Sequence, residues 1–183
     1  CLVGSEMCIR DSIRIKNKNQ VLEKKAYVDL QTGLPNKSKC EEMLNNYEYI
    51  TEPMGFVMFD LNNLKRANDT YGHAVGDQLI TNFARLLRNA IPAKDFVGRY
   101  GGDEFIAIIT QTTKNEILKI MDEVHDEVRN FNENIHKVEV SYAYGYAFSE
   151  DYADCTIKTL FDKADKHMYE NKAIEKAKFE TIV

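Results

Sequence analysis

Residues 96–109 read FVGRYGGDEFIAII, in which two short apolar runs flank a Gly-Gly-Asp-Glu sequence. Short apolar runs are typical of strands, and a glycine pair between them favours a tight turn. We therefore predict a β-hairpin with strands at Phe96–Tyr100 and Phe105–Ile109 and a turn at Gly101–Glu104. The rest of the fold is predicted outward from this hairpin.

The segments before the hairpin are predicted to add a strand and several helices. Gly55–Phe59 (GFVMF) is a continuous apolar run, which is typical of a buried strand. Apolar residues at helical spacing predict a helix over Gly76–Ala90, ended by Pro92, and the polar segment 62–73 is expected to hold a shorter one. Farther upstream we predict a turn at Thr32–Asn36, with one helix before it at Ile13–Val28 and another after it at Lys39–Tyr47.

The segments after the hairpin continue the alternation of helix and strand. Thr113–Glu116 is a capping box that opens a helix running to about Phe131. Val138–Phe148 alternates and is rich in aromatic residues, which predicts a strand. A helix over Thr159–Lys172 and a terminal edge strand over Phe179–Val183 complete the prediction. The fold class is therefore α+β, with a central, mostly antiparallel sheet covered by helices.

The composition is that of an ordinary folded domain with more acidic than basic groups. The 183 residues are 44% hydrophobic and 29% charged, which suits one domain with a short appendage. Because 24 basic residues accompany 29 acidic ones, binding to a nucleic-acid backbone is disfavoured. The apolar runs are far shorter than the ~18 residues of a membrane span, and no secretory signal opens the chain. The cysteines form no CxxC pair, so we expect reduced thiols in a cytoplasmic domain: Cys1, Cys8, Cys40 and Cys155.

Residues 1–25 are expected to form an N-terminal segment outside the domain of residues 26–183. The first twelve residues, CLVGSEMCIRDS, are unlike the rest and resemble translated sequencing-adapter sequence, and a short linker helix is predicted after them. Because the first residue is Cys1 rather than Met, we expect a fragment or a processed chain. On this interpretation an upstream partner domain is missing, and whether it held a membrane anchor stays open.

Acidic residues occur where the predicted strands end. Asp60 follows the apolar strand, and Asp103 and Glu104 lie in the hairpin turn. If that strand pairs beside the hairpin, the carboxylates meet at one edge of the sheet, next to the backbone carbonyl of Leu61. Hard oxygen ligands with open positions for phosphate oxygens are what Mg²⁺ prefers, and two such ions can clamp a phosphoryl transfer.

Other residues have the groups needed to hold a nucleotide. Asn68 and Asp77 supply an amide and a carboxylate, which can bond the edge of a guanine base. Gly101 and Gly102 leave room for the backbone to approach a ligand closely. Three lysines are available for phosphate contacts: Lys65, Lys172 and Lys176.

Each of these residues taken alone also has an ordinary structural explanation. Acids at strand ends are commonly solvated, Asn and Asp commonly cap helices, and surface lysines usually face water. A glycine pair is equally at home in a simple hairpin turn. The functional interpretation therefore depends on the combination.

The combination closely resembles the GGDEF domain of diguanylate cyclases over roughly Ala26–Val183. The resemblance is carried by FDLNNLKRANDTYGHAVGDQLI (59–80) and RYGGDEFIAII (99–109). DLQTGLPNK (29–37) is similar to the family's DxLTGLPNR, and DKADKHMYENKA (162–173) is similar to its final helix. Four motifs in the expected order are specific, whereas a lone GGDEF sequence would not be. The resemblance implies a fold of the nucleotide-cyclase or polymerase-palm type.

The resemblance also implies a role for each matching residue. Asp60 and Asp103 correspond to the ligands of Mg²⁺, with Mn²⁺ as the alternative ion, assisted by the Leu61 carbonyl and by Glu104. Asp103 is also implied as the proton acceptor for the attacking 3′-hydroxyl, and Lys65 as the group that stabilises charge on the phosphate. The remaining matches are implied to bind GTP: Asn68, His73, Asp77, Gly101, Gly102, Lys172 and Lys176.

The implied reaction converts two GTP molecules into cyclic di-GMP and two pyrophosphates. Each protomer binds one GTP, and two protomers face each other so that each 3′-hydroxyl attacks the other α-phosphorus. A homodimer is therefore part of the implied catalysis. The helix before Asp29 is the natural place for an upstream sensory domain to act.

Several positions depart from the family pattern. The DxLT motif reads Asp29-Leu30-Gln31-Thr32, and Lys37 stands where arginine is usual, so an ion pair between Lys37 and Asp29 would lose bidentate geometry. Asn62 replaces a frequent aspartate, and the sequence after Lys172 lacks the usual pattern, which puts the Lys176 contact in doubt. Pro92 replaces the arginine of the RxxD product-inhibition motif, so we expect no high-affinity feedback of the usual kind.

Three interpretations follow. The first is an active cyclase, favoured because the metal and guanine positions are all present. The second is a module that binds GTP and regulates a neighbour without turnover, for which an intact acidic site is not required. The third is a structural dimerisation domain, which leaves the polar residues unexplained.

Overall fold

The computed structural model describes residues 26–46, 50–134 and 138–181. Its four strands form one sheet in the order β2-β3-β1-β4, and every neighbouring pair is antiparallel. The predicted α+β class is confirmed, as is the hairpin. The elements in chain order are α2 (Lys37–Asn46), β1 (Met54–Leu61), α3 (Leu64–Tyr71), α4 (His73–Ala90), β2 (Phe96–Arg99), β3 (Glu104–Thr110), α5 (Lys114–Glu133), β4 (Tyr142–Phe148), the 3₁₀ helix η1 (Ser149–Asp151) and α6 (Ile157–Thr181).

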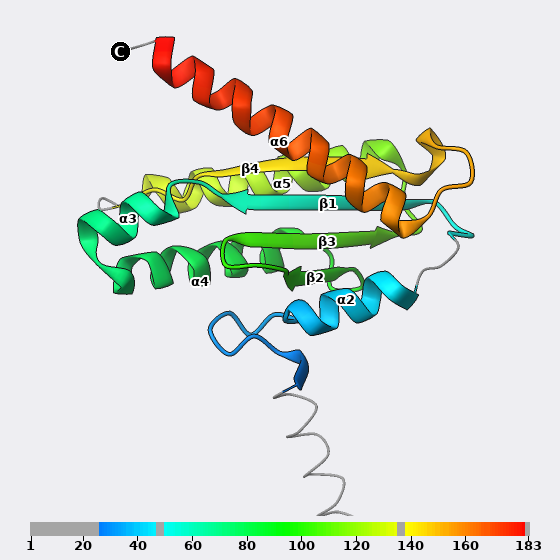
Figure 1. The fold of residues 1–183 in the computed structure, drawn as a ribbon, viewed down its shortest axis with the longest axis horizontal. Coiled ribbons are helices and arrows are strands. Elements are labelled where there is room, and N and C mark those ends of the chain that lie inside the picture. The colour runs from blue at the N-terminus through cyan, green and yellow to red at the C-terminus, as the bar shows by residue number, and fades with distance from the viewer. Residues whose placement is uncertain (1–25, 47–49, 135–137, 182–183) are drawn as a thin grey trace, which may run out of the picture.

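The two faces of the sheet are covered by different helices. Because side chains alternate along a strand, Val57 and Phe59 of β1 pack with α4 and α5, whereas Phe56 and Met58 pack with α2 and α6. All eight residues of β1 are buried, which is why its sequence is apolar from Met54 to Phe59, with Asp60 as the one buried charged residue of the strand. Figure 1 shows α6 crossing the sheet on the face opposite α4 and α5.

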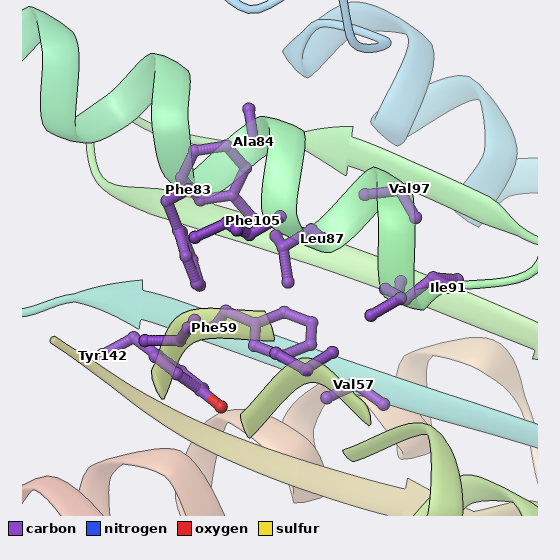
Figure 2. Packing of buried hydrophobic residues seen from close by; sticks show 14 of the residues in the cluster. Val57, Phe59, Phe83, Ala84, Leu87, Ile91, Val97, Phe105 and Tyr142 are labelled. Carbon is purple, nitrogen blue, oxygen red and sulfur yellow. The ribbon is translucent and has the colours of Figure 1, made fainter. Parts of the chain in front are cut away.

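Aromatic rings form the centre of the larger cluster, on the α4 side (Figure 2). The ring of Phe83 from α4 meets that of Phe105 edge-on, with centroids 5.3 Å apart, and that of Phe59 at 6.1 Å. Edge-to-face pairs of this kind add to the stabilisation from burial. This packing anchors α4 against the two central strands, whose ends carry the acidic residues.

The helix and strand boundaries confirm some predictions and correct others. The capping box of α5 is present, since the Thr113 hydroxyl accepts from the Glu116 backbone and Glu116 accepts from the Thr113 backbone. The prediction of an edge strand at Phe179–Val183 is wrong over Phe179–Thr181, which belong to α6, and its last two residues lie outside the described part of the chain. The strong helix formers of residues 173–178 make that extension favourable.

The last strand is shorter than predicted from Val138–Phe148. It begins at Tyr142, which pairs with Leu61, the last residue of β1. Before that point the backbone N–H and C=O of Val140 are hydrogen-bonded by the Asn132 side chain rather than by a neighbouring strand. The alternation of apolar and polar residues at positions 138–141 therefore extends beyond the available partner strand.

The predicted helix Ile13–Val28 lies largely outside the described residues, and so does the rest of the segment 1–25. Ala26 and Tyr27 are helical, and Val28 forms a single bridge with Pro35. Among the helices that the structure describes, none combines the length and the apolar character needed to cross a bilayer.

Candidate active site

The ends of β1 and β3 bring acidic residues together. The strand register pairs Asp60 with Glu104, and the Leu61 N–H donates to the Asp103 carbonyl at 2.9 Å. Asp60 is 9% exposed, and the Lys172 ammonium of α6 lies 2.6 Å from its Oδ1. We refer to Asp60, Asp103, Glu104 and Lys172 as the strand-end cluster.

The electrostatics of the strand-end cluster favour added positive charge. Burial raises the pKa of Glu104, and the nearby carboxylates of Asp103, Asp60 and Asp165 raise it further, while Lys172 opposes them. Carboxylates this close destabilise one another when they are ionised. A cation beside them would relieve that repulsion.

The oxygen atoms at this strand end are of the kind that bind a Mg²⁺ ion which also coordinates substrate phosphates. Among the described residues, no three His, Cys, Asp or Glu side chains gather into a group that could hold a metal ion by themselves. Mg²⁺ is commonly bound by one or two carboxylates plus substrate phosphates, so a full protein cage is not needed. The carboxylates of Asp60 and Asp103 and the carbonyl of Leu61 are oxygen donors of the required type, so the residues fit the ion.

Lys172 reaches Asp60 because α6 packs directly on β4. A Cβ at Gly145 would lie 2.2 Å from backbone atoms of both Ala164 and Met168, so only glycine permits this approach. The Asn171 amide also donates to the Tyr144 carbonyl at 2.9 Å. The helix contact therefore sets the position of the Lys172 side chain.

A second group lies on α3 and α4. Asn68 of α3 fits beside Gly76, where a Cβ would fall 1.9 Å from the Asn68 Oδ1. That oxygen is buried and accepts no hydrogen bond from the described part of the protein. Asp77, the residue after Gly76, is exposed at the start of α4. We refer to Asn68 and Asp77 as the helix-end pair.

Arg99 connects the hairpin turn to the loop of residues 29–36. Its Nε and Nη2 donate to the carbonyls of Gly101 and Gly102 at 3.1 and 2.8 Å, and its Nη1 lies 3.2 Å from both carboxylate oxygens of Asp29. Although burial opposes ionisation, hydrogen bonds from Thr32 and the charge of Arg99 hold the pKa of Asp29 below its ordinary value. The ion-pair partner of Asp29 is thus Arg99.

The Asp29–Lys37 pair considered from the sequence does not form, because Lys37 instead approaches Glu41 and the ring of Tyr100. Asp95, left from the incomplete RxxD motif, accepts through Oδ1 from the backbone N–H and the hydroxyl of Thr110. That contact fastens the start of β2 to the end of β3. The expected lack of feedback stays a prediction.

Some predicted site residues are not joined to either group. Lys65 of α3 and His73, the first residue of α4, are exposed. Gly102 is exposed in the turn, and Lys176 lies on α6, one turn beyond Lys172, where side chains are outside the description. Lys65 and His73 would act at the same site as the strand-end cluster and the helix-end pair only if one bound ligand contacted them all.

Sequence reasoning missed three residues near the site: Arg99, Gln31 and Asp165. Arg99 precedes the turn directly, and a fixed cation beside glycine carbonyls could have been anticipated. The contact of Gln31 with Asp77 spans 46 positions, and no local pattern signals it. Asp165 stands in the KAD sequence of the final motif, and its charge acts on Glu104 across the fold.

Comparison with known proteins identifies the family. Residues 26–178 match the family described as "Diguanylate cyclase, GGDEF domain". The chain therefore belongs to the GGDEF domain family, whose members include diguanylate cyclases. This match covers both the strand-end cluster and the helix-end pair.

Individual relatives agree with this assignment. The chain is 27% identical over 165 residues to Diguanylate cyclase A of Treponema denticola, covering 85% of this chain and 44% of that protein. It is 33% identical over 147 residues to the Probable diguanylate cyclase DgcI of Escherichia coli K12, covering 79% of this chain and 30% of that one. The chain thus spans less than half of either relative.

The fold is shared with a solved structure of the coiled coil and GGDEF domain of DgcB from Caulobacter crescentus, in complex with c-di-GMP. The TM-score is 0.78 at 22% identity, with 92% of this chain and 94% of that chain covered. This similarity shows a common fold.

Proposed function

We propose that this chain is the catalytic domain of a diguanylate cyclase, which condenses two GTP molecules into cyclic di-GMP with release of two pyrophosphates. The observation that carries the proposal is the strand-end cluster, in which carboxylates meet at the paired ends of β1 and β3 beside Lys172. Such a cluster suits phosphoryl transfer. Membership of the GGDEF family supports the same reaction.

The helix-end pair would select the base. The Asp77 carboxylate can accept from the ring N–H and the exocyclic amine of guanine, and the Asn68 amide can bond the purine carbonyl and ring nitrogen. Adenine lacks a ring N–H and an amine at these positions, so it would leave Asp77 unpaired.

The strand-end cluster would act on the α-phosphate. When bound, Mg²⁺ supplies charge neutralisation for the phosphates, held by Asp60, Asp103, Glu104 and the Leu61 carbonyl. The Asp103 carboxylate takes the proton of the 3′-hydroxyl as the new O–P bond forms, and the bond to the departing pyrophosphate breaks. The ammonium groups of Lys65 and Lys172, with Lys176 as a further candidate, stabilise the negative charge that develops.

The reaction requires two copies of the domain. One protomer holds one GTP, and its 3′-hydroxyl must meet the α-phosphorus of a GTP on its partner. We propose a homodimer in which the two sites face each other. We also propose that the domain works in the cytoplasm, and that the helix expected before Asp29 is where an upstream sensory domain acts on it.

The proposal is tested by incubating the purified chain with Mg²⁺ and either GTP or ATP, followed by chromatographic separation of the products. We expect cyclic di-GMP and pyrophosphate from GTP and no cyclic product from ATP. A chain that binds GTP but forms no product, even when dimerised by a fused coiled coil, would instead be a regulatory binding module. A cyclic product from ATP would contradict the role given to Asp77.

A further inference from the structure

The side-chain amide of Gln31 lies between Arg99 and Asp77. Arg99 Nη1 donates to the Gln31 Oε1 at 2.6 Å, and the Gln31 Nε2 donates to the Asp77 Oδ1 at 2.9 Å. A longer contact of 3.4 Å joins the same Nε2 to the Asp77 carbonyl. One amide thus connects the loop, the end of β2 and the start of α4.

The orientation of this amide is determined by chemistry. The guanidinium of Arg99 carries only donors, so it must face the Gln31 oxygen. The amide nitrogen is then directed at Asp77, whose carboxylate carries only acceptors. The Gln31 amide can therefore form both hydrogen bonds only with its oxygen toward Arg99 and its nitrogen toward Asp77.

Arg99 is itself held firmly. It is half-buried, and it also contacts Asp29, Gly101 and Gly102. By contrast, Asp77 is exposed, and within the described residues Gln31 is the one side chain that hydrogen-bonds its carboxylate. Arg99 is therefore held in place at the hairpin turn by several contacts, whereas the orientation of the Asp77 carboxylate depends on Gln31.

We propose that Gln31 is a positioning residue for Asp77, which holds the carboxylate in the orientation that recognises guanine and links base binding to the Gly101–Gly102 turn. This inference rests on the proposed function. A carboxylate has about four acceptor positions, and Gln31 occupies one of them. The others stay available for the ring N–H and the exocyclic amine.

The test compares Gln31→Leu and Gln31→Glu with the wild-type chain. Leu removes both hydrogen bonds, whereas Glu keeps an acceptor for Arg99 but directs a second carboxylate at Asp77. Equilibrium binding of GTP and of inosine triphosphate, which lacks the exocyclic amine, is measured together with KM and kcat. Gln78→Leu is the matched control, because Gln78 is an exposed neighbour on α4 with no side-chain hydrogen bond among the described residues.

We expect Gln31→Leu to weaken GTP binding and to raise KM about fivefold, the effect of one hydrogen bond, with kcat little changed. Binding of inosine triphosphate should weaken less, so that the preference for GTP falls. Gln31→Glu should weaken GTP binding more than Gln31→Leu does. Gln78→Leu should match the wild type, and melting temperatures should confirm that all variants are folded.

Two results would overturn the inference while leaving the proposed function intact. The first is a wild-type chain that converts GTP, with both Gln31 variants matching it in KM and in preference. The second is Gln31→Glu binding GTP as well as wild type does, which would mean that Gln31 serves only to hold Arg99. A wild-type chain that shows no GTP binding would overturn the proposed function and this inference together.

Discussion

The strand-end cluster and the helix-end pair are built in different ways. Asp60 and Glu104 occupy adjacent positions fixed by the strand register, and α6 packs over them. Asp77 is exposed on a helix, and its carboxylate is held by a Gln31 side chain from a distant loop. Backbone pairing determines the first arrangement, whereas the second depends on packing of Asn68 against Gly76 and on one side-chain hydrogen bond to Asp77, so the two should respond differently to mutation.

Asp103→Ala should have the largest effect, which should be a loss of turnover without a loss of folding. Removing the proton acceptor and metal ligand should lower kcat by about 10³-fold or more. Because the Asp103 backbone contact with Leu61 is retained, the fold should persist. Turnover is measured by product chromatography and folding by circular dichroism.

The matched control is Asp122→Ala, an exposed aspartate on α5. Normal product formation by Asp103→Ala would sink the mechanism assigned to the strand-end cluster.

Gly145→Ala should damage the strand-end cluster through packing. The added Cβ would collide with the α6 backbone at 2.2 Å, and overpacking of this kind costs about 3 kcal/mol. We expect a lower melting temperature and lost turnover. Gly102→Ala is the stability control, since a Cβ there meets nothing within 4 Å. Equal melting temperatures for Gly145→Ala and wild type would show that α6 is not packed as described.

Asp77→Asn should affect nucleotide choice more than chemistry. The loss of a charged acceptor should raise KM for GTP by about 10- to 100-fold, because hydrogen bonds to charged groups contribute about 1.5–3 kcal/mol. The kcat at saturating GTP should change little. Asp69→Asn, an exposed aspartate on α3, is the matched control in steady-state kinetics. An unchanged preference for GTP over ATP would remove Asp77 from base recognition.

Asp29→Asn should have the smallest effect, a modest loss of folding stability, because it removes the ion pair between Asp29 and Arg99. The pKa of Asp29 is lowered on folding, so its ionised form stabilises the fold above the ordinary carboxyl pKa. The variant should lose about 1 kcal/mol at neutral pH. This difference should shrink as pH falls through the lowered pKa, because wild-type Asp29 then becomes protonated.

Denaturant unfolding of wild type and Asp29→Asn from pH 7 down to pH 3 measures this difference. A stability gap that is constant, or that widens in acid, would mean that Asp29 does not act through its charge.

The parts of the fold that depend on local patterns could be predicted from the sequence. The apolar run of β1, the glycine turn and the Thr113 capping box each carry their own signal. The edge strand predicted at Phe179–Val183 failed because helix propensity in the preceding residues carries α6 onward. The predicted start of β4 was wrong because that start depends on where its partner strand β1 ends.

The candidate site shows the same division. Asp60, Asp103 and Glu104 could be placed together because a register follows from a hairpin and one neighbouring strand. The Arg99–Gln31–Asp77 connection could not, since it requires knowing which loop lies against which helix. Side-chain bonds between distant segments leave no periodicity in the sequence.

If each domain holds half of the reactants, as proposed, the rate of cyclic di-GMP formation per mole of chain must depend on protein concentration, and this rate is the first quantity to measure. We expect a rate per mole that rises with concentration and levels off as the dimer forms. Fusion to a dimeric coiled coil should give the high rate at every concentration. A rate per mole that is independent of concentration in the unfused chain, or no product from the fused dimer, would contradict the claim.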